Sequence, residues 1–230
     1  AFNSVYPNTL DEELSKRDTE IFRRFNSVLS LTYRRYIDLL EAEAQAREAQ
    51  IETALERVRS RTMAMHKSEE LSQAAELLYS EFLKLGVTPF SIGYVINDDK
   101  AKQWKVWMTD ANDDKFKEFW TLPFKADRHL ENRYDSWKRK DDFHFSLLEG
   151  KENIKHHEVI ANFAPWKKDS LKDLPHRLVL NSAHFLQGHL LIVTSDLLSA
   201  HEEKLLCRFA KVFEQTYARF LDLKKAEERA

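Results

Sequence analysis

Histidine is the residue type here with the widest chemistry, since an imidazole can bind a metal, move a proton or accept a phosphoryl group. His156 and His157 are adjacent, so on a helix their side chains would lie about 100° apart and could not share one metal as residues four apart can. His184 and His189 flank the turn of a predicted hairpin, a spacing that a metal could use but that nothing else in the sequence supports. We therefore expect structural or surface roles for all four, with no metal and no cofactor.

Two further residues could carry chemistry alone. His66 ends a long predicted helix, but it is followed by Lys67 rather than by the acid that usually follows a phospho-accepting histidine in kinases, so we expect a polar helix-end residue. Cys207 is the only cysteine and cannot form an internal disulfide, so we expect a packed or half-exposed helix thiol.

Loops and pairings typical of enzymes are missing from the sequence. The 4 glycines are well separated, which excludes a phosphate-binding glycine-rich loop. We therefore expect no ATP-dependent kinase core in this chain. No nucleophile and base stand in a recognisable local arrangement. We expect no catalytic residue and no enzymatic activity.

Composition narrows the class further. With 230 residues and 43% hydrophobic residues, the chain is large enough to bury a core. The 36 basic and 38 acidic residues nearly balance, which favours neither nucleic acid nor an anionic membrane as a partner. The sequence contains no run of about 18 apolar residues that could span a bilayer. We expect a folded cytoplasmic protein.

The sequence predicts one long helix, which should position the domain that follows it. Residues 15–66 contain neither glycine nor proline and are rich in helix-forming residues. Apolar residues recur every three or four positions, in two phases separated by a shift near Leu40, as in a coiled coil with a stutter. We predict that this helix pairs with that of a second copy in a parallel homodimer, although the stripe could instead pack on the chain's own globular part. The predicted dimer interface is Phe22, Phe25, Leu29, Tyr36, Ile51, Leu55 and Val58.

The two ends of the chain nearly repeat each other. Residues 15–46 match residues 199–230 at a constant offset of 184, with eleven identities in the 23 positions from Arg24 to Ala46. Both copies begin with Ser-x-x-acid, a capping box that starts a helix. We interpret the chain as a segment of a longer tandem array, with one complete domain between two copies of the same exit helix.

Between the long helices, the pattern predicts a mixed domain. Helices are expected at 71–85, 129–140 and 154–162, strands at 90–97, 102–109, 116–124, 177–185 and 189–195, and a short apolar stretch without assigned structure at 143–148. This order describes an α+β fold with an antiparallel sheet and helices packed on one side, preceded by the long helix. The predicted divisions are a lead-in at 1–14 that is a candidate remnant of a preceding domain, a signalling helix at 15–67, the domain at 68–199 and an exit helix at 200–230 that leads to the next module.

The order of elements and the exit sequence at residues 208–223 resemble those of a GAF domain flanked by signalling helices. The resemblance covers the domain from about Ser68 and the helix that enters it. It implies a regulatory module without chemistry of its own, part of a larger bacterial signalling protein such as a histidine kinase-like sensor of a two-component system. Such a module relays a change in ligand or packing to adjacent domains of the chain.

The resemblance also implies a ligand cavity, which in GAF domains is covered by these strands and helices. Aromatic walls suit a small organic molecule. The predicted ligand-binding residues are Tyr94, Trp107, Phe119, His129 and Trp137. Trp104 and Trp107 should point to opposite faces of the sheet by strand alternation. In the alternative, the rings fill the cavity themselves, and the domain is a structural dimerisation scaffold that binds no small molecule.

Overall fold

A computed structural model describes residues 15–67, 70–110, 113–116, 119–164 and 174–229. The predicted lead-in at 1–14 lies outside the described residues. The chain divides into two units, residues 1–50 and residues 51–230, which are considered separately. In the described part of the chain, no helix combines the length and the apolar character needed to cross a membrane.

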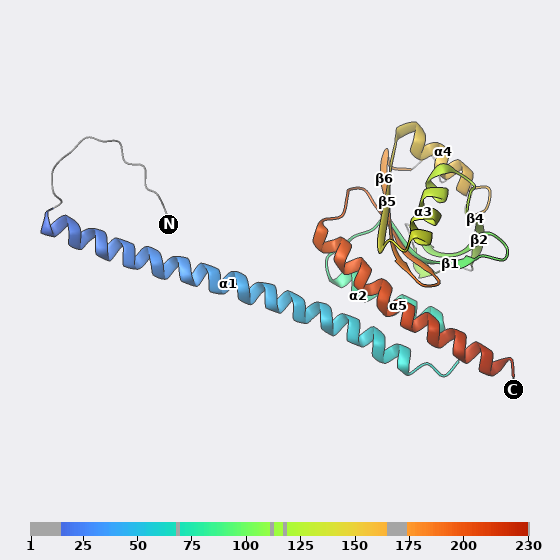
Figure 1. Cartoon of the computed structure of the whole chain (residues 1–230), viewed down its shortest axis with the longest axis horizontal. Coiled ribbons are helices and arrows are strands. Elements are labelled where there is room, and N and C mark those ends of the chain that lie inside the picture. The colour runs from blue at the N-terminus through green and yellow to red at the C-terminus, as the bar shows by residue number, and fades with distance from the viewer. Residues whose placement is uncertain (1–14, 68–69, 111–112, 117–118, 165–173, 230) are drawn as a thin grey trace. The chain divides into compact units, whose positions relative to one another are not determined.

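Helix α1 (Lys16–Met63) is continuous, as the absence of glycine and proline predicts (Figure 1). The side-chain oxygen of Ser15 accepts a hydrogen bond from the backbone N–H of Asp18 at 3.2 Å, which confirms the predicted start of the helix. In the first unit the apolar side chains of α1 are exposed, apart from the half-buried Ile37.

The second unit is built on an antiparallel sheet. Its strands are β1 (Ser91–Asp98), β2 (Gln103–Asp110), β3 (Asp113–Phe116), β4 (Trp120–Pro123), β5 (Phe143–Glu149), β6 (Arg177–Phe185) and β7 (Gly188–Thr194). The strand order is β3-β2-β1-β7-β6-β5, with β4 paired to β2. Both predicted hairpins are confirmed, since β1 pairs with β2 and β6 pairs with β7.

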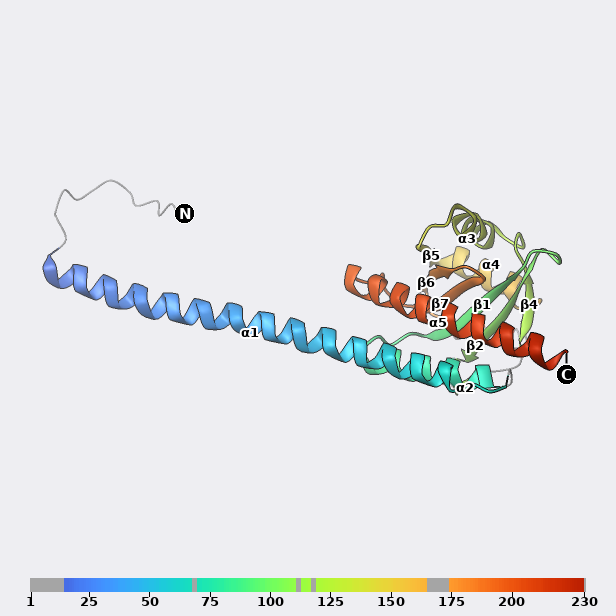
Figure 2. The same cartoon turned by 60° about the horizontal axis from the view of Figure 1, so that its bottom comes forward.

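One face of the sheet is covered by α2 (Leu71–Lys84), α5 (Ala200–Glu227) and the last turns of α1 (Figures 1 and 2). Apolar side chains of β1 and β7, including Ile92, Tyr94 and Ile192, pack there against α5. The predicted capping box at Ser199 and Glu202 starts α5, which confirms that element.

The opposite face carries α3 (Arg128–Arg139) and α4 (Gly150–Ile160) (Figure 1). Asp127 caps α3 by accepting a hydrogen bond from the backbone N–H of Leu130 at 2.8 Å. The predicted α+β class and antiparallel sheet are confirmed, but helices lie on both faces rather than on one. The physical reason is that β6 and β7 are buried almost throughout, so both faces need a cover.

The last turns of α1 belong to the core of the second unit. The hydroxyls of Thr62 and Thr216 lie 2.7 Å apart in a buried contact between α1 and α5. Nearby, Arg57 pairs with the buried carboxylate of Glu81 on α2 at 3.1 Å. These contacts fix α1 against the two helices that cover the sheet.

This packing corrects one part of the predicted dimer interface. Ile51, Leu55 and Val58 are at most 1% exposed within the chain itself, so they are not available to a partner helix. For these three residues the alternative holds, because the stripe packs on the chain's own globular part, with α2 and α5 as its partners.

Candidate functional site

Polar residues replace apolar ones at one end of the face covered by α3. His144 on β5 lies opposite Ser182 on β6, and His184 on β6 lies opposite His189 on β7. By strand alternation these side chains share the face of Leu178 and Leu180, which belong to the core beneath α3 and α4. Strands β5, β6 and β7 thus place three imidazoles and a hydroxyl side by side on one surface.

Helix α3 places Arg133 over this surface. Helical spacing from Leu130, which is fully buried, puts Arg133 and Ser136 on the inward side of α3. The guanidinium carbon of Arg133 lies 5.8 Å from the ring centroid of Trp104, and the residue is 3% exposed. Its Nε and Nη2 atoms have no hydrogen-bond partner among the described residues.

The guanidinium of Arg133 keeps its positive charge although it is buried. Burial lowers the pKa of Arg133 to about 10, although the carboxylate of Asp127 acts in the opposite direction. The side chain is therefore still protonated at neutral pH. No carboxylate of the described residues makes an ion pair with it.

The imidazoles below it are neutral. Burial, reinforced by the charge of Arg133, lowers the pKa of His144 and of His184 to about 4. The same causes hold the pKa of His189 well below its ordinary value. A neutral imidazole can still donate one N–H, so these rings add hydrogen-bonding capacity without adding charge.

Several donors of this cluster lack a partner. Both ring nitrogens of His189, Nδ1 of His184 and the hydroxyl of Ser182 are buried without a hydrogen bond among the described residues. Nε2 of His184 is 3.3 Å from the hydroxyl of Ser136, which ties the cluster to α3. We call Arg133, His144, Ser182, His184 and His189 the arginine cluster. One buried cation with several unused donors is suited to an anionic group.

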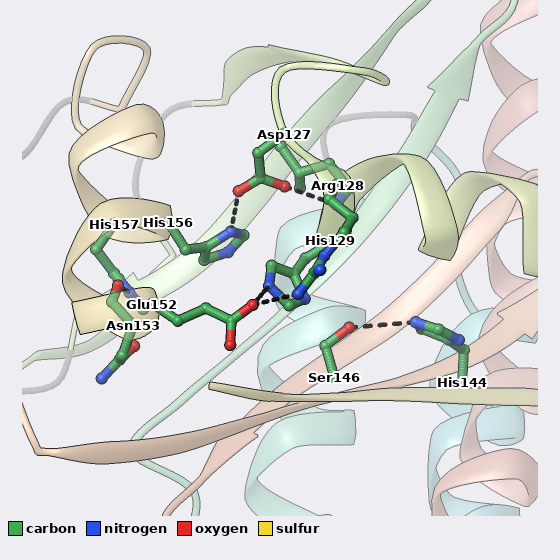
Figure 3. Close-up of polar contacts among 10 residues, drawn as sticks. Asp127, Arg128, His129, His144, Ser146, Glu152, Asn153, His156 and His157 are labelled. Atoms are coloured by element: carbon green, nitrogen blue, oxygen red, sulfur yellow. Dashed lines mark hydrogen bonds and ion pairs between the residues drawn. The ribbon is translucent and has the colours of Figure 1, made fainter. Parts of the chain in front are cut away.

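A serine and a histidine also meet in this region, but they do not form a nucleophilic pair. Nε2 of His144 is 3.2 Å from the hydroxyl of Ser146 on the same strand (Figure 3). A base of pKa about 4 removes a proton from a serine poorly, and no described carboxylate forms a hydrogen bond with this imidazole.

A second polar group joins the start of α3 to α4 (Figure 3). Asp127 pairs with Nδ1 of His156, and Glu152 pairs with Arg128 and, at 2.9 Å, with Nε2 of His129. Burial opposes ionisation of Asp127, but the hydrogen bond from His156 leaves the pKa of this carboxyl below its ordinary value. Burial lowers the pKa of His156 below its ordinary value, although the carboxylate of Asp127 acts in the opposite direction. This group fastens two helices above the sheet.

The five predicted ligand-binding residues do not line one cavity, so that prediction is wrong. Tyr94 stacks on Trp107 with centroids 4.9 Å apart, and Trp107 contacts Phe119 at 5.2 Å. Tyr94 also packs against Phe213 of α5, on the face opposite α3. The void beside Tyr94 is about 10 Å³, which is too small for anything larger than water.

The other two predicted residues belong to α3. His129 takes part in the pairing with Glu152 described above. Trp137 donates its indole N–H to the backbone carbonyl of Phe185 at 2.9 Å. The strand alternation of Trp104 and Trp107 is confirmed, since Trp104 belongs to the core under α3 and Trp107 packs on the other core.

Sequence reasoning singled out two members of the arginine cluster but expected only structural or surface roles for them, and it missed the other three. His184 and His189 stood out as residues flanking a turn, whereas His144, Ser182 and Arg133 did not. The sequence does contain a pattern that could have identified Arg133. This residue lies three positions after Leu130, a spacing that places it on the buried side of a helix. Among the described residues, no group of three or more histidine, cysteine or acidic side chains could hold a metal ion.

Comparisons with known proteins leave the family open. No family model and no curated protein matches the chain. A solved GAF domain from an Acinetobacter phosphoenolpyruvate-protein phosphotransferase is similar, with 10% identity, 72% of this chain and 91% of that chain covered, and a TM-score of 0.47. A phycoerythrobilin-bound GAF domain from a cyanobacterial phytochrome shows 11% identity, 73% and 96% coverage, and a TM-score of 0.39. Both scores lie below 0.5, so the fold description rests on the strand order and helix positions given above.

Proposed function

We propose that this chain is a non-catalytic regulatory module whose arginine cluster binds the acidic group of a small molecule. The observation that supports it is the guanidinium of Arg133, which is buried and protonated while two of its nitrogens lack a partner. The GAF resemblance of the sequence is compatible with such a sensory role.

The free-energy cost of burying its charge makes this guanidinium unusual. A buried charge costs several kcal/mol unless it is paired and hydrogen-bonded. Contact with the ring of Trp104 offsets only part of that cost, on the order of 2 kcal/mol. A structural role would be served better by an apolar residue of the same size. A role in binding explains why the charge is there.

The chemistry of the cluster favours a carboxylate or a phosphate. The planar guanidinium can donate from Nε and Nη2 to two oxygens of one acidic group. Neutral His184 and His189, with Ser182, can donate to the remaining oxygens. The ligand would therefore replace the missing hydrogen bonds of both the cation and its neighbours.

A route leads from the cluster to the long helices. On β7, His189 faces α3, while the next residue, Leu190, packs in the core against α5. Helix α5 in turn contacts α1 through the buried Thr62 and Thr216 hydroxyls. A shift of β7 on ligand binding would thus reach both helices, which is how the module could relay a change to neighbouring domains.

The alternative is a structural scaffold without a ligand. It is favoured by the aromatic packing on the other face, where Tyr94 and Trp107 leave almost no space. The two functions differ in what they predict for the arginine cluster, because a scaffold has no use for an unpaired cation.

Thermal unfolding with added acids tests the proposal. Succinate, inorganic phosphate and adenosine monophosphate should be compared with equal ionic strength of chloride, for the unmodified chain and for Arg133→Met. A ligand that binds only the folded state raises the melting temperature. We expect an acid-specific rise that is lost in Arg133→Met. An equal response of both proteins would contradict the proposal.

A further inference from the structure

Residues 21–33 of α1 carry an apolar face that nothing in the described structure covers. Phe25 is 69% exposed, Val28 is 65% exposed and Tyr33 is 64% exposed. Exposed aromatic and branched residues at helical spacing mark a surface that another part of a protein covers. The question is what covers it.

The sequence repeat at an offset of 184 residues aligns α1 with α5, and this comparison indicates what covers the exposed face. Eight residues of α5 are buried, and their equivalents in α1 form the exposed face. The buried residues are Leu205, Leu206, Phe209, Ala210, Val212, Phe213, Thr216 and Tyr217. The equivalents are Ile21, Phe22, Phe25, Asn26, Val28, Leu29, Thr32 and Tyr33.

Four of the eight buried positions of α5 are occupied by the same residue in α1. Phe209, Val212, Thr216 and Tyr217 are identical to their equivalents and are at most 8% exposed. The other four pairs keep an apolar residue on both sides, apart from Asn26 in place of Ala210. The same side chains are therefore buried against a sheet in one copy and exposed in the other.

Local hydrogen bonds agree with this equivalence. Thr32 donates to the carbonyl of Val28 at 3.0 Å, as Thr216 donates to that of Val212 at 3.1 Å. In α5 this hydroxyl also meets Thr62 of the entering helix.

We propose that residues 21–33 of α1 are the closing helix of a second domain of this same fold, whose sheet and entering helix cover the exposed face. Helix α1 is then shared between two domains. Its first half closes the preceding domain, and the stretch that contains Ile51, Leu55 and Val58 opens the domain described above.

This proposal competes with the predicted coiled-coil dimer. Phe22, Phe25 and Leu29 belong to both the predicted seam and the exposed face. Their equivalents in α5, Leu206, Phe209 and Phe213, are fully occupied in the core of the domain. A face filled by a sheet is not free for a partner helix, so the two interpretations exclude each other for these residues.

A helix exchange within the chain tests the proposal. Residues 1–198 are joined to residues 15–46, which replaces α5 by its equivalent, and the product is compared with residues 1–198 alone. We expect one cooperative thermal transition about 10–15 °C below that of the intact chain, whereas the truncated chain shows no such transition. Because Asn26 would enter the fully buried site of Ala210, the exchange is repeated with Asn26→Ala.

Two substitutions in the exchanged helix provide the matched pair. Phe25→Asp places a charge at the buried position of Phe209 and should abolish the transition, while Ser27→Asp occupies the exposed position of Lys211 and should leave it intact. The proposal is overturned if neither exchange chain is more stable than the truncated one. Loss of self-association of the intact chain with Phe25→Asp, together with failed exchange, would assign the face to a second copy.

Discussion

The guanidinium of Arg133 lies over the ring of Trp104 at 5.8 Å, and both side chains are buried on the face that α3 covers. The indole N–H of Trp104 also lacks a partner among the described residues. A cation held by an aromatic ring and neutral imidazoles, with no carboxylate paired to it, is costly in a folded protein. The first prediction tests whether that cost is real.

Arg133→Met should stabilise the ligand-free protein. Methionine fills a similar volume and removes the buried charge, so we expect the free energy of unfolding to rise by about 1–3 kcal/mol. Urea unfolding in a buffer without carboxylate or phosphate measures it. Asn132→Ala, on the exposed side of the same helix, is the control and should change stability by about 0.5 kcal/mol or less. A marked loss of stability in Arg133→Met would show that the charge is satisfied within the fold.

Stability should fall on mild acidification. His184 has a pKa of about 4 in the folded chain against 6.5 for an unperturbed histidine, so between these values the unfolded chain binds a proton that the folded chain does not. Its contribution is complete above about pH 6.5 and is lost as the pH falls towards 4. We expect His184 alone to cost about 2 kcal/mol between pH 7.5 and 5.

The variant His184→Gln isolates this effect. Urea unfolding at both pH values should show a smaller pH-dependent loss for the variant than for the unmodified chain. Ordinary aspartates and glutamates titrate mostly below this window, so they add little. An unchanged loss in the variant would mean that His184 is not the neutral, buried imidazole described above.

Thr62 and Thr216 should be energetically coupled. Replacing either by valine removes one hydroxyl of the buried pair, for an expected loss of about 1 kcal/mol each. The double variant should lose less than the sum, by about 0.5–1 kcal/mol, because the second substitution removes no further contact between the helices. A double-mutant cycle in urea measures this coupling, and strict additivity would argue against a direct contact of α1 with α5.

Leu55→Ala should lower stability rather than dissociate a dimer. The side chain is 1% exposed inside the chain's own core, so its truncation should cost about 2–5 kcal/mol. Glu56→Ala, one residue later and exposed, should cost little. Urea unfolding and sedimentation of both variants distinguish the cases. A change in oligomeric state at unchanged stability would contradict this prediction and indicate that Leu55 lies in a dimer interface.

Much of the fold is predictable from local sequence patterns. Strand alternation and the turn at Asp98 and Asp99 predict the first hairpin, and Gln187 and Gly188 mark the second. The partner of a stripe is harder to predict. Ile51 and Leu55 show the three- and four-residue spacing of a coiled coil, but the same spacing serves a helix packed on its own domain. Only the folded structure identifies α2 and α5 as the partners.

The site is less predictable because its members come from distant parts of the chain. Arg133 lies about fifty residues before His184, and no local pattern joins them. Aromatic content predicted a cavity around Tyr94 and Trp107, but rings that are large enough to line a cavity are also large enough to fill it. The unpartnered polar atoms that favour a ligand are visible only after folding.

The most direct test of the central claim is an equilibrium titration of tryptophan fluorescence with the acid that stabilises the protein most. Arg133 contacts Trp104, so an acid bound by this guanidinium should change the emission of that ring. We predict a saturable change that is absent from both Arg133→Met and Trp104→Phe. A saturable change of equal size in Arg133→Met would contradict the claim, because the acid would then bind without the buried cation.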